Sequence, residues 1–161
     1  MASFEAHVDQ AKKNLDFLFD NNSNGSLHWD WQVTTCFYVA VHVANAHLAK
    51  VANLHYRTHE AVKIALSPNP LSLTQLPEDV YLSYAKLEGL SRRARYLCHN
   101  EPDKRDDSIA FFTHEKHFAK AIKNLDKFLT YFSKMYGIDF GKIKIRCGYL
   151  DKKSPISIFT I

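Results

Sequence analysis

The chain has 161 residues, which is the length of a single domain with its own core. Apolar residues make up 46% and charged residues 24%, while Gly and Pro number only five each, so a disordered chain, a Pro/Gly-rich linker and a turn-dense β-sandwich are disfavoured. The formal net charge of +4 is uneven: residues 1–80 hold five Lys/Arg against eight Asp/Glu, and residues 81–161 hold 16 against nine. A basic half of this kind can attract phosphates.

The sequence lacks the features of membrane, secreted and metal-binding proteins. No apolar run approaches the roughly 20 residues of a membrane helix, and the first ten residues contain two acids and no apolar core, unlike a secretory signal. Cys36, Cys98 and Cys147 are widely spaced and form no C-x-x-C pair, so neither a zinc site nor a disulfide framework is predicted. We therefore expect a cytoplasmic protein with reduced thiols and with no metal or other cofactor.

Two long helices are predicted in the first third of the chain. The first covers about residues 4–19, where apolar residues recur at helical spacing, and the polar run at residues 20–26 ends it. The second covers about residues 30–52, with Asp30 as its N-cap or first-turn acid. Nearly every face of this second helix is apolar or weakly polar, so it should be the central, buried helix.

A short helix and two more long helices follow. Thr58 can cap the short one, and the third long helix covers about residues 77–99. The fourth runs from a cap at Ser108 to Gly137, and its apolar residues alternate steps of four and three, which is typical of a bundle seam. The expected fold is all-α: an up-and-down four-helix bundle over residues 1–137 with a short extra helix.

The character of the chain changes after the fourth helix. Residues 143–146 and 156–161 alternate between apolar and polar side chains, which predicts two short strands that can form a hairpin. Because a lone hairpin is marginal in water, the extension at residues 138–161 should pack on the bundle or on the partner in a dimer.

The fourth predicted helix carries a row of lysines opposite its apolar stripe. Helical geometry places on that side Lys116, Lys120, Lys123, Lys127 and Lys134. No acid of the same helix interrupts the row. It is either a solvated face or a track for phosphates.

Residues 87–100 contain the cluster best suited to chemistry. Glu88, Arg92, Arg95 and His99 fall on one flank of the third long helix. Two guanidiniums there would form an anion site, and a neighbouring imidazole could move a proton. The structural alternative is that Glu88 pairs with Arg92 one turn on, and that Arg95 pairs with a neighbouring helix.

The histidines do not predict a metal site. His114 and His117 lie one turn apart, but no acidic partner pattern accompanies them, so a surface pair is expected. His42 and His47 are expected to be satisfied core or interface histidines. The motifs of common hydrolases, nucleotide-binding loops and zinc proteases are absent from the sequence.

Two stretches carry a resemblance to a known family. The first is the aromatic-rich second helix with the histidine that follows it, carried by Asp30, Trp31, Phe37, Tyr38, His42, Ala46, His59 and Glu60. The second is the segment Leu90-Ser91-Arg92-Arg93-Ala94-Arg95-Tyr96, which is similar to an "lS..aRY" pattern. Together they span about residues 28–100 and resemble small stand-alone prokaryotic proteins of the HEPN-domain family.

This resemblance implies an up-and-down helical bundle that often forms homodimers and that works in prokaryotic toxin–antitoxin or defence systems, beside an antitoxin or a nucleotidyltransferase. Many members are metal-independent ribonucleases with an Arg followed, four to six residues later, by a His. Arg92 and Arg93 both meet that spacing with His99. The residue after the Arg and those after His99 depart from the active pattern, as in a branch of the family whose ribonuclease motif is degenerate.

Three functions remain open from the sequence. The first is binding of RNA or a nucleotide by Arg92, Arg95, Tyr96, Lys116, Lys120, Lys123 and Lys127. The second is metal-independent RNA cleavage by Arg92 or Arg93 with His99. The third is a protein-interaction module that presents to its partner Tyr81, Tyr84, Ile158 and Phe159.

Overall fold

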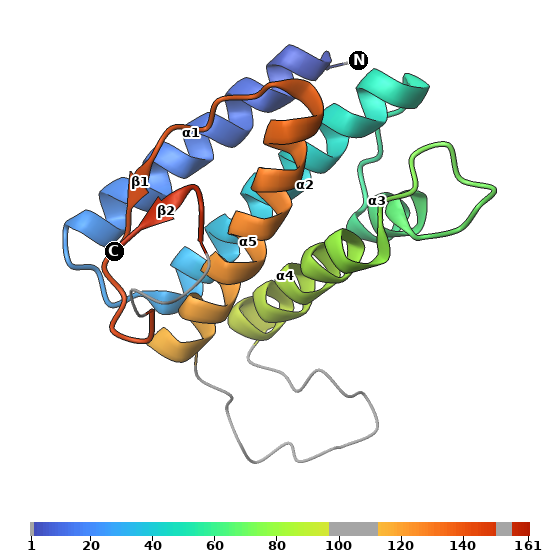
Figure 1. Ribbon diagram of the computed structural model, residues 1–161. Helices are drawn as coiled ribbons and strands as arrows, with labels where there is room; N and C mark the ends of the chain where they lie inside the picture. The colour runs from blue at the N-terminus through green and yellow to red at the C-terminus, as the bar shows by residue number, and fades with distance from the viewer. Residues whose placement is uncertain (1, 97–112, 151–155) are drawn as a thin grey trace, which may run out of the picture.

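The chain folds mainly into helices, as expected. A computed structural model describes residues 2–96, 113–150 and 156–161. Its elements in chain order are the helices α1 (Phe4–Ser23), α2 (Trp29–Ala52), α3 (His59–Leu66), α4 (Glu78–Tyr96) and α5 (Glu115–Tyr136), and the strands β1 (Ile143–Lys144) and β2 (Phe159–Thr160) (Figure 1). None of the helices in this part of the chain combines the length and the apolar character needed to cross a membrane.

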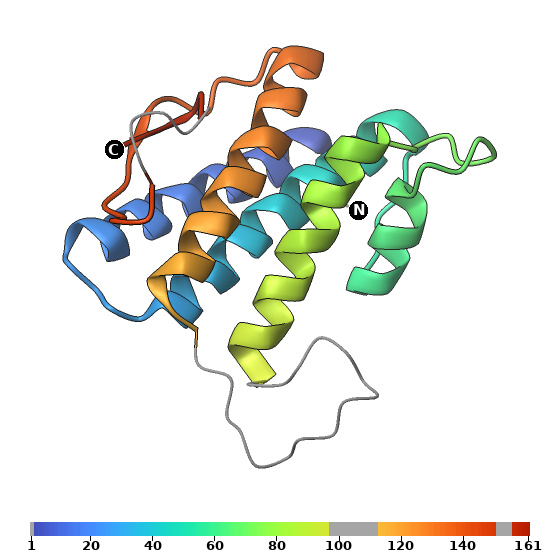
Figure 2. The ribbon, with the colours of Figure 1, turned by 60° about the horizontal axis from the view of Figure 1, so that its bottom comes forward.

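Helix α2 is the centre of the molecule. It packs against α1, α4 and α5, and its side chains are buried on most sides, as the apolar composition of this segment predicts (Figure 2). Asp30 lies in its first turn. Long helices that follow one another in the chain run in opposite directions (Figure 1): Asn22, near the end of α1, donates to Gln32, near the start of α2, at 2.9 Å. Asp79, at the start of α4, pairs with Lys127 in the second half of α5.

The C-terminal extension covers the side of the molecule between α1 and α5 (Figure 1). The side chain of Asn22 holds the main chain of Arg146 through two hydrogen bonds, of 3.0 and 2.6 Å. The carboxylate of Asp126 accepts hydrogen bonds from the backbone N–H groups of residues 157–159 at 2.7–3.1 Å. Ile145 and Phe159 are buried in the core. The extension therefore packs on the helices of its own chain.

The two strands of this extension do not form a hairpin. They pair in parallel, with Ile143 opposite Phe159 and Lys144 opposite Thr160. A hairpin requires antiparallel strands, so that prediction is wrong. Alternation of apolar and polar residues indicates extended chain on a half-buried surface, but it does not give the direction of pairing.

The ends of α1 and α3 follow from local chemistry. Helix α1 continues to Ser23, one turn beyond the predicted end, because residues of the polar run remain helical. Thr58 caps α3 as predicted: its hydroxyl accepts from the backbone N–H of Ala61 at 3.3 Å.

Helix α5 begins later than predicted. It starts at Glu115, after the N-cap His114, so Ser108 is not its cap; Ser108 lies outside the described residues. The backbone N–H of His114 donates to Nδ1 of His117 at 2.9 Å, and His117 is buried. The expected surface pair is therefore wrong, because one imidazole of the pair closes the helix end. Gly137 ends α5 in the left-handed conformation, with φ 67°.

Candidate functional site

A cleft of about 750 Å³ lies on the surface between α3, α4 and α5. Four cationic side chains, one carboxylate, one amide and four apolar or small residues surround it. The lining residues are Lys63, Leu82, Ala85, Lys86, Glu88, Gly89, Leu90, Arg92, Lys120 and Asn124. The volume falls within the range of about 300–1,000 Å³ that is typical of small-molecule sites.

The lining of the cleft carries a net positive charge, and among the described residues one of its four cations is paired. Lys63 Nζ lies 3.1 Å from Glu88 Oε2, and this contact raises the pKa of Lys63. Glu88 is itself buried, so the pair forms part of the cleft wall. Lys86, Arg92 and Lys120 form no ion pair with any described residue. Within the described ranges, these three cations can meet an anion without first breaking an ion pair.

The wall that α4 contributes is apolar or small. Leu82 is 44% exposed, Leu90 is partly buried, and Ala85 and Gly89 leave room between them. A planar apolar group of a ligand could rest here while its anionic group meets the cations, which is the common division of labour in ligand sites.

The predicted arginines occupy different surroundings. Arg92 is exposed and lines the cleft. The proposed ion pair between Glu88 and Arg92 is wrong, because Glu88 binds Lys63 of α3 instead. Arg93 is half-buried; burial of His117, together with the nearby charge of Arg93, lowers the pKa of His117 to about 4. His99, the predicted partner in catalysis, lies outside the described residues.

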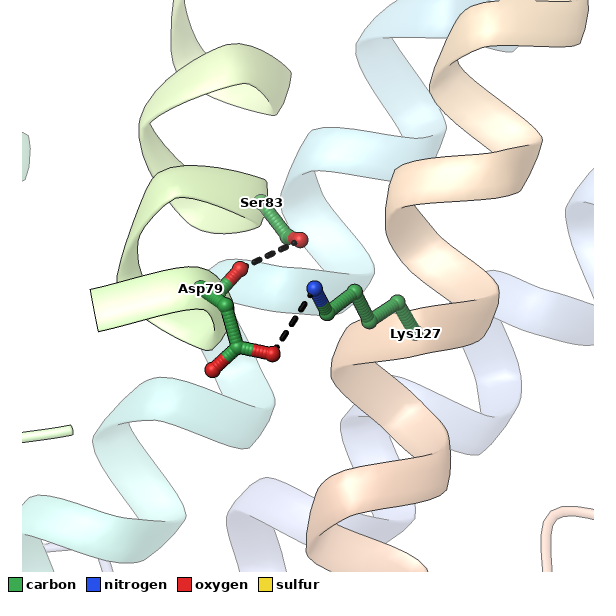
Figure 3. A network of polar contacts seen from close by, with 3 residues as sticks. All are labelled: Asp79, Ser83 and Lys127. Carbon is green, nitrogen blue, oxygen red and sulfur yellow. Dashed lines mark hydrogen bonds and ion pairs between the residues drawn. The ribbon is translucent and has the colours of Figure 1, made fainter. Parts of the chain in front are cut away.

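Of the lysine row on α5, Lys120 alone lines the cleft. Lys116, Lys123 and Lys134 are exposed on the same helix but do not line it. An acid does interrupt the row: Lys127 Nζ lies 2.8 Å from Asp79 Oδ2, and it lowers the pKa of that carboxyl (Figure 3).

The residue that neutralises Lys127 comes from α4. The hydroxyl of Ser83, one turn further on, donates to the main-chain oxygen of Asp79 at 3.1 Å. Spacing along α5 could not reveal this pair, because Asp79 lies 48 residues earlier in the sequence.

His59 was not among the predicted site residues, yet it lies where the two stretches of the resemblance meet. Its ring packs edge-on against Phe37 at 5.0 Å and against Tyr38 at 6.1 Å between centroids. Burial and, to a lesser extent, the charge of Arg95 lower the pKa of His59, while Glu88 opposes this shift. Arg95 stacks on Tyr96, with Cζ 5.2 Å from the ring centroid, and its Nε donates to the Ser91 carbonyl oxygen at 3.4 Å.

Sequence reasoning also missed three of the polar residues that line the cleft. They are Lys63, Lys86 and Asn124. The spacing of His59 and Lys63, four residues apart on the short helix, places both on one face and was the available signal. The sequence does not reveal that this face of α3 is turned toward α4, because that depends on tertiary packing.

His47 behaves as expected for a satisfied core histidine, whereas His42 is only partly buried. His47 Nδ1 and Tyr136 Oη are 2.6 Å apart, and His47 Nε2 lies 3.2 Å from the Thr74 carbonyl oxygen, which confirms the prediction for His47. His42 Nδ1 contacts His7 Nδ1 at 3.3 Å, and His7 Nε2 contacts His55 Nδ1 at 3.2 Å.

These three rings form a row rather than surrounding a common point. No group of three or more His, Cys, Asp or Glu side chains within the described ranges is arranged to hold a metal ion.

The surface predicted for a protein partner is mostly interior. Tyr84 and Phe159 are fully buried, Ile158 is nearly so, and Tyr81 is partly buried. Tyr84 packs against Phe37 and contacts the core of its own chain. The prediction of a contact surface is wrong for Tyr84, Ile158 and Phe159, because apolar periodicity marks a buried face without telling a core from an interface.

No family model, curated protein or solved structure matches this chain. The chemistry of the described residues is therefore the basis for assigning a function. It consists of a cleft with three cations that form no ion pair in the described part of the chain, a small apolar wall, and an imidazole and a guanidinium on the adjoining turns of α3 and α4.

Proposed function

We propose that the chain is a HEPN-like protein that binds RNA or a nucleotide in the cleft between α3, α4 and α5. The observation that carries this proposal is a set of three cations around an apolar wall, Lys86, Arg92 and Lys120, none of which is paired with a residue that the structure describes. Arg92 offers a planar fork of donors that matches two phosphate oxygens, and the lysines add point charges. A base can rest on the wall formed by Leu82 and Leu90.

The family and its arrangement belong to the same proposal. The two stretches that resemble HEPN proteins come together around His59, as expected if both serve one site. We propose an up-and-down four-helix bundle of that family, a homodimer in solution, and a role in a prokaryotic toxin–antitoxin or defence system beside an antitoxin or nucleotidyltransferase. The antiparallel order of α1, α2, α4 and α5 supports this arrangement.

Fluorescence anisotropy with a labelled eight-nucleotide single-stranded RNA, measured over a salt series, tests the binding. We expect Arg92→Ala and Lys120→Ala each to weaken binding and to reduce the slope of log K against log salt by about 0.7, which is the contribution of one phosphate contact. Lys134→Ala is the matched control, because it removes the same charge from the same helix outside the cleft.

Two results would contradict the proposal. One is the absence of binding at 50 mM salt by the unaltered protein, where phosphate contacts are strongest. The other is an equal loss for Lys134→Ala and Lys120→Ala, since binding would then depend on net charge and not on the cleft.

A further inference from the structure

Contacts with neighbouring aromatic rings hold His59 in a fixed orientation. The aromatic rings of Phe37 and Tyr38 fix its plane, and the residue is partly buried. Its imidazole makes no hydrogen bond to any residue in the described ranges. An oriented, partly desolvated imidazole with free nitrogens is suited to a ligand that offers hydrogen-bond acceptors.

The packing of α3 on α4 brings His59 to the end of the cleft. The two helices are antiparallel, since α3 ends near the segment that leads into α4 and the N–H of Leu76 donates to the Leu66 carbonyl oxygen. The pair Lys63–Glu88 fixes their register. His59 lies one turn before Lys63, toward the start of α3. Arg92 and Arg95 lie one and two turns after Glu88, toward the end of α4.

Arg95 can therefore act together with His59. Its Nε bonds the main chain and its plane stacks on Tyr96, which orients the guanidinium. Its terminal nitrogens form no ion pair with a described residue. The charge of Arg95 contributes to the lowered pKa of His59, as the register of α3 and α4 predicts.

We propose that His59 and Arg95 form a second anion-binding subsite, adjoining the cleft at Arg92, which holds the next phosphate of a bound single-stranded RNA. This inference rests on the proposed function. A strand would place one phosphate at Lys120 and Arg92 and the following one at His59 and Arg95, while the exposed rings of Tyr38 and Tyr96 offer surfaces on which bases can stack. His59 is a binding residue here, and no covalent step is assigned to it.

The subsite should respond to pH. The groups that face His59 are Arg95 and Glu88 of α4, Tyr38 of α2, and Glu60 and Lys63 on its own helix. Without ligand, the imidazole is neutral at pH 7. A phosphate beside it favours the protonated form, so RNA binding takes up a proton and becomes tighter as the pH falls.

Anisotropy titrations with the same eight-nucleotide RNA at pH 6 and pH 8 test the subsite. We expect the unaltered protein to bind about tenfold more tightly at pH 6, the effect of one charge-assisted hydrogen bond. His59→Gln should remove this difference by weakening binding at pH 6, and Arg95→Gln should weaken binding at both pH values. His28→Gln and Arg146→Gln are the matched controls, since both residues are exposed and lie outside the cleft.

The outcomes separate the two proposals. If His59→Gln keeps the pH dependence while Arg92→Ala still weakens binding, the subsite is wrong and the cleft stands. The subsite is equally wrong if His59→Gln weakens binding to the same extent at both pH values, as a merely structural histidine would. If the unaltered protein binds RNA at neither pH, the proposed function fails first and the subsite with it.

Discussion

Asp126 is a buried carboxylate whose charge is met by main-chain N–H groups. It lies in the middle of α5 and is only 3% exposed, and the residues it contacts belong to the C-terminal extension. Backbone donors are fixed in direction, so a carboxylate that accepts several of them holds the segment without the entropy cost of a long cationic side chain. Asp126 thus joins two parts of the chain that are about 30 residues apart.

Replacing this carboxylate by an amide should destabilise the protein. In Asp126→Asn, one acceptor oxygen becomes a donor that faces N–H groups, and we expect the free energy of unfolding to fall by about 2 kcal/mol. Urea denaturation followed by circular dichroism measures this change. Asp9→Asn, at an exposed position of α1, is the control and should change stability by less than about 0.5 kcal/mol. Equal effects of the two substitutions would contradict the assigned role.

At the scale of single residues, the sequence predicted which charged side chains are available for an anion better than it predicted which charged side chains pair with each other. Arg92 and Lys120 were expected to bind an anion, and both line the cleft. Glu88 was expected to meet Arg92, because spacing within one helix is all that a sequence displays. Its actual partner, Lys63, lies on another helix.

Helix α2 ends at a residue that adopts the left-handed backbone conformation. Asn53 follows α2 with φ 53° and ψ 39°, the left-handed conformation, and its N–H donates to the Ala49 carbonyl oxygen at 3.2 Å. Asn tolerates this conformation better than residues other than Gly do.

We therefore expect Asn53→Gly to leave the free energy of unfolding unchanged or slightly higher, and Asn53→Ala to lower it by about 1 kcal/mol. Chemical denaturation of both variants measures the difference. Asn24→Ala is the matched control, because Asn24 follows α1 with φ −75°, an angle that Ala adopts freely. A loss for Asn24→Ala as large as that for Asn53→Ala would show that backbone conformation is not the cause.

The elements themselves were largely predictable and their terminal details less so. Helical spacing located all four long helices, and Thr58 marked the start of the short one. The start of α5 was placed at Ser108 because Ser is a common cap, whereas His114 and His117 close the helix instead. The strands were found from their alternation, which does not reveal that they pair in parallel.

The molecule as a whole contains several histidines that folding keeps neutral. Burial lowers the pKa of five of them: His7, His42, His47, His59 and His117. In the unfolded chain they titrate near their ordinary value of about 6.5. Below that pH the unfolded state binds more protons than the folded state, so acidification favours unfolding.

The free energy of unfolding should accordingly be highest above pH 6.5 and decrease as the pH falls from 6.5 toward 4. Between pH 7.5 and pH 5, His117 alone should account for about 1–2 kcal/mol of this loss. Urea denaturation at several pH values measures it. His117→Gln should flatten the dependence, whereas the exposed His28→Gln should not. Stability that stays constant over this range would contradict the burial of these groups.

The candidate site could be predicted only in part because it is a property of the whole molecule. The basic half of the chain and the arginines of α4 predicted that the protein binds an anion. The cleft itself is formed by three helices, and Lys63 and Asn124, one from each of the flanking helices, lie 61 residues apart in the sequence. Residue patterns within single helices carry no information about which residues of different helices line the same cleft.

The two hydrogen bonds between the Asn22 side chain and the Arg146 main chain join residues 124 positions apart, so they can form only late in biosynthesis. On the ribosome, α1 and α2 can associate as soon as both have left the exit tunnel, because their contacts are local. The faces of α1 and α5 under the extension must wait for the last 24 residues of this sequence to be translated. During that interval the nascent chain presents apolar surface to chaperones, and long-range contacts of this kind close slowly.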